Sequence, residues 1–66
     1  MGAFLKLSTA KVEITVERHI AGYYGIYRLN LVSRLMEQIG CETNLKRAKK
    51  LAVELMRREI VVKEAV

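Results

Sequence analysis

The sequence predicts a small α+β domain in which one N-terminal strand is followed by two amphipathic helices and a short C-terminal element. β-branched residues alternate with polar ones over residues 11–17. The apolar spacing then changes to three and four residues over 26–39, and again over 44–58. With 66 residues the chain has room for one domain, residues 1–66.

Residues 11–17 are predicted to form a half-buried strand after a mixed lead-in at 1–10. Val12, Ile14 and Val16 alternate with charged or polar neighbours, the period of two of a strand with one buried face. A helical interpretation also exists, because Val12, Val16 and Ile20 fall at spacings of four residues. It would place Ile14 on the polar side, and β-branching disfavours a helix.

The first helix is predicted over residues 26–39. Leu31, Leu35 and Ile39 follow one another at four-residue steps, with polar residues on the other side. Gly40 is placed to end this helix in a left-handed cap.

The second helix is predicted over residues 44–58, with Thr43 or Asn44 as its N-cap. Its buried side should consist of Leu45, Ala48, Leu51, Ala52, Leu55 and Met56. Residues 59–66 are rich in β-branched side chains and are predicted as a short strand, with a frayed helical end as the alternative.

The predicted strand needs a partner, because one strand cannot satisfy its own backbone hydrogen-bonding groups. Three partners are open: residues 4–8, the C-terminal run, or the same strand of a second chain. The first two pairings lie within one chain, and the third makes a dimer obligatory.

Chain length and composition favour a homodimer. A chain of this size buries only part of its apolar surface, and small domains gain stability from disulfides, metals or partner subunits. Cys41 is the single cysteine, and Cys41 and His19 are too few for a zinc site. The hydrophobic content of 52% is generous for so small an interior. We therefore expect a two-fold dimer.

The same composition predicts a cytoplasmic protein. A single cysteine suits a reducing compartment. The sequence contains neither an apolar run of membrane-spanning length nor the apolar core of a signal peptide.

The chain offers little that suggests catalysis, a cofactor or a metal. His19 has no nucleophile near it in sequence and is interpreted as a loop histidine. Cys41 is interpreted as a small packing residue, with a reactive thiol as the alternative. The glycines of the segment 22–25 match neither a dinucleotide nor a phosphate-loop pattern, so they indicate a turn. The tyrosines at 23, 24 and 27 suit the rim of a core or interface, and stacking on nucleic-acid bases is the second interpretation.

The second helix carries the strongest functional signal. Glu54 is the single acid of residues 44–58, and this segment alone accounts for the formal net charge of +5 of the whole chain. The basic residues are Lys46, Arg47, Lys49, Lys50, Arg57 and Arg58. All but Lys49 share an arc opposite the apolar stripe, while Lys49 lies at its edge. A face of one sign attracts phosphates, whereas a face that serves only solubility normally mixes signs.

The order of strand, helix, glycine turn and basic helix resembles the ribbon-helix-helix DNA-binding proteins. The resemblance implies a homodimer whose paired strands lie in the major groove. Lys11, Glu13 and Thr15 would then face the bases, and Thr43 and Asn44 would contact the phosphate backbone. Carboxylates on the outward strand face and a longer connection to the first helix depart from that family.

Two further resemblances use the same basic helix. A helix-turn-helix or winged-helix arrangement would make residues 44–58 the recognition helix. The stretch from Leu45 to Glu54 is also similar to a helix in the C-terminal domain of the ribosomal stalk protein, which would make the basic face a docking surface for proteins. The sequence thus favours a homodimeric regulator that binds duplex DNA, with a protein-docking module as the alternative.

Overall fold

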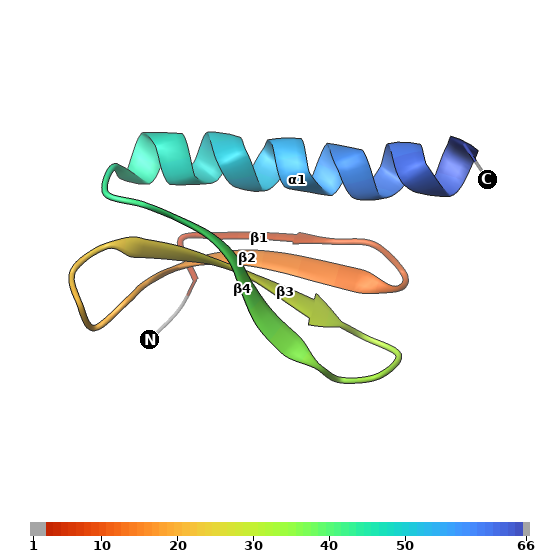
Figure 1. The fold of residues 1–66 in the computed structure, drawn as a ribbon, viewed down its shortest axis with the longest axis horizontal. Helices are drawn as coiled ribbons and strands as arrows, with labels where there is room; N and C mark the ends of the chain where they lie inside the picture. Colours follow the sequence, from red (N-terminus) through yellow and green to blue (C-terminus); the bar gives the residue numbers. More distant parts are fainter. Residues whose placement is uncertain (1–2, 66) are drawn as a thin grey trace.

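The chain folds into one four-stranded antiparallel sheet that is covered on one face by a single long helix (Figure 1). The computed structural model describes the backbone of residues 3–65 and the side chains of residues 3–59. The elements in chain order are β1 (Leu5–Ser8), β2 (Val12–Arg18), β3 (Tyr24–Asn30), β4 (Met36–Glu42) and α1 (Leu45–Ala65).

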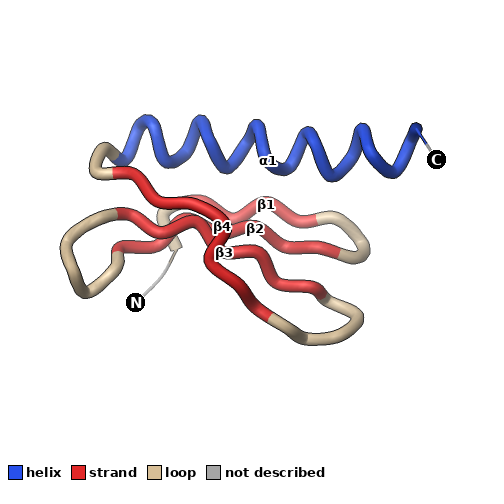
Figure 2. The backbone as a smooth tube through the Cα atoms, in the orientation of Figure 1, coloured by secondary structure: helices blue, strands red, loops and turns tan. Residues whose placement is uncertain are grey.

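The sheet is a simple meander in which every strand pairs with its neighbour in sequence, in the order β1-β2-β3-β4. Strands and turns alternate along the tube in Figure 2 until the chain crosses over into α1. The register aligns Leu5 with Val16, Val16 with Ile26, and Ile26 with Gly40. Because paired residues share a face of the sheet, one apolar row runs across all four strands beneath α1.

The core lies between this row and the inner side of α1. Its buried residues are Val12, Ile14, Val16 and Ile26 from the sheet, and Ala48, Ala52 and Met56 from the helix. Ile14, Val16 and Ile26 are the largest side chains that are fully buried. The two alanines are small enough to let the helix approach the strands closely.

Gly40 lies where α1 passes over β4. A Cβ at this position would lie 3.3 Å from Ile26 Cδ1 and 3.3 Å from Leu51 Cδ2, closer than ordinary van der Waals contact. The next residue towards the N-terminus, Ile39, falls between the register pairs of Gly40 and Gln38 and forms a β-bulge. The missing side chain therefore makes room for the helix.

The predicted fold class, one strand followed by two helices in a ribbon-helix-helix arrangement, is wrong. Residues 26–39, predicted as a helix, form most of β3, a tight turn and the first part of β4. Gly40 does not end a helix, because it lies inside β4. The backbone of 59–65 continues α1 instead of forming a strand, and residue 66 of that prediction lies outside the described residues.

Other predictions are confirmed. The strand at 11–17 is β2, shifted by one residue, and the helix at 44–58 is the first part of α1 with the predicted residues on its inner side. Of the three possible strand partners, the lead-in residues are the one observed, as β1. Among the residues described, no helix combines the length and the apolar character needed to cross a membrane.

Candidate nucleic-acid interface

The outer side of α1 gathers most of the exposed basic side chains of the second half of the chain. Leu45, Ala48, Ala52 and Met56 recur at spacings of three and four and contact the sheet. Leu51 and Leu55 pack against the same core, and the polar residues between these positions face solvent. The basic face of α1, as the term is used below, consists of Lys46, Arg47, Lys50, Arg57 and Arg58, all of which are exposed.

The positive charge of this face is not neutralised within the described part of the chain. None of its five cations lies within 4.0 Å of a described carboxylate. Lys49 is also exposed, and Glu54 is the single exposed acid between Asn44 and Arg58. Within residues 3–59 no carboxylate therefore pairs directly with these cations, and they are available to an external anion.

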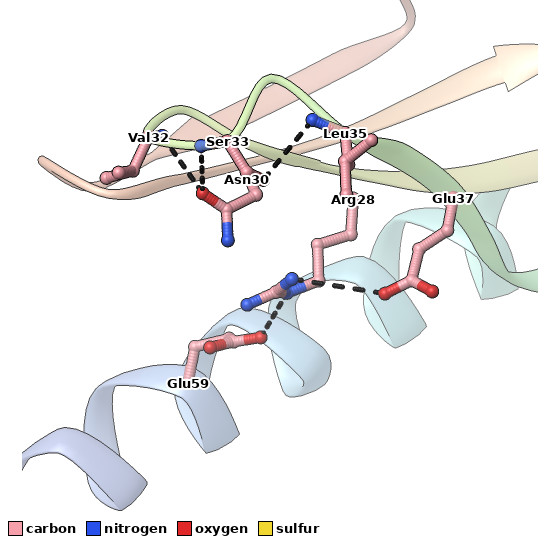
Figure 3. Close-up of polar contacts among 7 residues, drawn as sticks. All are labelled: Arg28, Asn30, Val32, Ser33, Leu35, Glu37 and Glu59. Atoms are coloured by element: carbon pink, nitrogen blue, oxygen red, sulfur yellow. Dashed lines mark hydrogen bonds and ion pairs between the residues drawn. The ribbon is translucent and has the colours of Figure 1, made fainter.

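Glu59, which directly follows the basic face in the chain, is turned away from it. Glu59 points under the helix, where its Oε1 atom accepts a hydrogen bond from Arg28 Nε at 2.5 Å (Figure 3). Arg28 Nη1 also lies 3.9 Å from Glu37 Oε1 of β4. The hydrogen bond to Glu59 raises the pKa of Arg28, and partial burial opposes that shift. The pair therefore links α1 to β3 beneath the C-terminal half of the basic face.

The N-terminal end of α1 is capped as predicted. Asn44 Oδ1 accepts a hydrogen bond from the backbone N–H of Arg47 at 3.2 Å. Thr43 and Asn44 are both exposed in the turn between β4 and α1. The first turn of the helix contains no acidic residue, so Lys46 and Arg47 lie beside the positive end of the helix dipole.

Lys11 and Thr15 do not belong to this face. Lys11 is exposed in the turn between β1 and β2. Thr15 lies on the sheet face opposite α1, where it is buried and its hydroxyl lies 3.4 Å from Glu17 Oε2. Because β2 is paired on both edges, by β1 and β3, it cannot form a two-chain ribbon. The base-facing role that the resemblance implied for Lys11, Glu13 and Thr15 is therefore lost with that fold.

The aromatic side chains do not form one stacking platform. Tyr23 stacks on His19 in the β2–β3 turn, with ring centroids 4.4 Å apart. Tyr24 packs against the core and meets Phe4 edge to face. Tyr27 lies on the opposite sheet face, over Gly25, where a Cβ would lie 2.6 Å from its hydroxyl oxygen. The three tyrosines are thus divided between two faces and a turn.

His19 and Cys41, the two residues considered for catalysis or metal binding, lie in a turn and at the surface of the sheet. His19 lies in a turn, and its Nδ1 accepts a hydrogen bond from the backbone N–H of Ala21 at 3.0 Å. Cys41 is exposed on β4, not packed in the interior. The described residues include no group of His, Cys, Asp and Glu side chains that could hold a metal ion.

A shallow groove of about 350 Å³ runs beneath the C-terminal half of the basic face. It is lined by Arg28, Ile39, Leu55, Arg58 and Glu59. The sequence did not predict that Arg28 and Glu59 are partners, because Arg28 was assigned to a helix and Glu59 to a strand. The alternation of Tyr24, Ile26 and Arg28 on one strand face is the signal that could have placed Arg28 under α1.

Comparison with protein families, with characterised proteins and with solved structures gave no match.

Proposed function

We propose that this protein binds duplex DNA through the basic face of α1. The observation that carries the proposal is a set of five exposed cations, Lys46, Arg47, Lys50, Arg57 and Arg58, on the side of the helix opposite its buried side. Such a face binds the phosphate backbone by releasing condensed counterions, whatever the base sequence.

The dimensions of the helix suit several phosphates at once. At a rise of 1.5 Å per residue, Lys46 and Arg58 are separated by roughly 18 Å along the helix axis. Lys50 and Arg57 lie between them and within about 20° of each other around the axis. The cations are thus spread over a length that can follow a strand of the duplex.

This arrangement favours binding that depends on charge more than on base sequence. Phosphate contacts fix position, whereas base-edge contacts give specificity. A role in transcription regulation, which the sequence suggested, requires that the protein bind some DNA sequences more tightly than others. That preference is measured by comparing a set of unrelated duplexes in the assay described next.

The test is the salt dependence of duplex binding. If all five cations neutralise phosphates, the slope of log K against log salt should be about −4.5, so affinity should fall about 500-fold between 50 and 200 mM salt. Changing Lys46, Arg47 and Lys50 together to Ala should reduce the slope to about −2. Fluorescence anisotropy with a labelled mixed-sequence duplex measures both values.

A matched control removes the same charge elsewhere. Lys6, Lys11 and Arg18 are exposed and lie outside α1, and Lys6 forms a 3.8 Å ion pair with the half-buried Glu13. Changing these three to Ala should leave the slope near its original value. An equal loss of DNA affinity in the two triple variants would show that net charge alone acts. Unchanged DNA affinity in the helix variant would refute the proposal. A protein-docking module predicts no salt-sensitive DNA binding even at 50 mM.

A further inference from the structure

Glu54 is an exposed acid placed among the basic residues on the outer side of α1. Lys50 lies four positions before it, and Arg57 and Arg58 lie three and four positions after it, the spacings at which side chains on one face of a helix meet. Among the described residues, however, no cation lies within 4.0 Å of the Glu54 carboxylate. The carboxylate therefore serves no ion pair within its own helix.

The cations of the basic face form two columns along the helix, with Glu54 between them. At about 100° per residue, the cations of one column lie about 40–80° to one side of Glu54 around the helix axis, and those of the other lie about 20–40° to the other side. The first column is Lys46, Lys50 and Arg57, and the second is Arg47 and Arg58. Because α1 lies alone on its side of the sheet among the described elements, both columns are open to a large partner (Figure 1).

Two columns of cations with a carboxylate between them suit a helix seated in the major groove of duplex DNA. The groove is about 12 Å wide and admits an α-helix, and a phosphate strand borders it on each side. Each column can then contact one phosphate strand, and the side chain between the columns points at the base edges. A carboxylate placed against phosphates would be repelled, whereas a carboxylate over base edges can accept a hydrogen bond. The position of Glu54 therefore favours contact with a base.

We infer that Glu54 reads base edges in the major groove and selects cytosine, a role that rests on the proposed binding of duplex DNA. An ionised carboxylate accepts hydrogen bonds and donates none. Cytosine presents its N4 amino donor in the major groove, whereas guanine and thymine present acceptors that repel a carboxylate. Adenine also presents an amino donor, but its N7 acceptor lies beside that donor and repels the second carboxylate oxygen. Cytosine is therefore the base that suits Glu54 best.

The test compares two labelled duplexes of equal length, so that the contribution of the phosphates is the same in both. One consists of A·T pairs alone, and in the other every third pair is C·G, so that any placement of the helix meets a cytosine. Fluorescence anisotropy should show that the natural protein binds the second duplex about fivefold or more tightly. Glu54→Ala should bring the ratio of the two affinities near unity. Glu54→Gln should reverse the preference, because a Gln side chain pairs with N6 and N7 of adenine.

Glu37 provides the matched control, because its side chain is 67% exposed and it lies on β4, outside α1. Glu37→Gln removes the same charge and should leave the ratio of affinities unchanged. Equal, salt-sensitive binding of both duplexes by the natural protein would overturn the role of Glu54 and leave the proposed function standing, whereas no binding to either duplex would overturn both. A ratio that Glu54→Ala leaves intact, or that Glu37→Gln changes equally, would also overturn it. Circular dichroism of each variant shows that a lost preference is not a lost fold.

Discussion

The ion pair between Arg28 and Glu59 should be the strongest polar link between the sheet and α1. The side chains are only 25% and 33% exposed, and the bond between them is 2.5 Å long. Exposed ion pairs contribute about 0.2–1 kcal/mol, and removing one partner of a fully buried pair costs about 3–5 kcal/mol. A half-buried pair with a charge-assisted hydrogen bond should lie between these limits, with a coupling free energy of about 1–2 kcal/mol.

The second acid near Arg28 provides a matched comparison. Glu37 is 3.9 Å from the same guanidinium and 67% exposed, so its coupling should be below about 0.5 kcal/mol. Two double-mutant cycles, Arg28→Met with Glu59→Gln and Arg28→Met with Glu37→Gln, separate the pairs, with the free energy of unfolding measured in urea. A coupling to Glu59 no larger than that to Glu37 would refute the reasoning.

Two further predictions concern glycine and tyrosine positions in the sheet. Gly40→Ala should lower the free energy of unfolding by about 1 kcal/mol and Gly40→Val by more, because the new atoms press on Ile26 and Leu51; a variant as stable as the natural protein in urea would contradict this. Desolvation is the main effect that raises the pKa of Tyr27 above its ordinary value of 10.0, and the charges of Tyr23 and Glu17 raise it further. Its protonated form is therefore favoured by folding, and the stabilisation is complete below about pH 10 and is lost as the pH rises through the raised pKa. The drop in unfolding free energy between pH 9 and pH 11.5 should be smaller in Tyr27→Phe, and equal drops would show that Tyr27 does not contribute.

Two elements could be predicted from the sequence because their signals are local. Val12, Ile14 and Val16 alternate within one strand, and burial of the same three residues confirms that pattern. The helix begins after Asn44, whose side chain caps it, and Ala48 and Ala52 mark its buried side. The basic face followed from the same periodicity. For this reason the candidate site could be located even though the fold around it was predicted wrongly.

The prediction of a helix over 26–39 was wrong because the four-residue spacing of its apolar residues came from a hairpin turn and a strand bulge. Leu31 and Leu35 lie at the two sides of a hairpin turn, and Ile39 lies at the bulge of β4. Their four-residue spacing imitates a helix face. Asn30 and Ser33, interpreted as the polar side of that helix, instead hold the turn. Without a glycine or proline at the tip, no strong punctuation separates the strands.

The other features that the sequence did not predict depend on contacts between distant parts of the chain. Gly40 looks like a helix cap in sequence, but its lack of a side chain is needed because α1 crosses β4 there. The partnership of Arg28 with Glu59 joins residues 31 positions apart. Neither relation has a local signature. Both become visible only when the helix has been placed on the sheet.

The order of the elements has a consequence for how the protein is made. Each strand pairs with the strand just synthesised, so the meander can assemble from short-range contacts as it emerges. The helix follows the sheet in the chain and has 21 residues, which at about 5–20 residues per second take roughly 1–4 s to synthesise. During those seconds Val12, Ile14, Val16 and Ile26 lie on an uncovered sheet. The sheet is therefore most prone to aggregate before α1 has been made and has folded onto it, and chaperones that bind apolar surfaces have their opportunity in that interval.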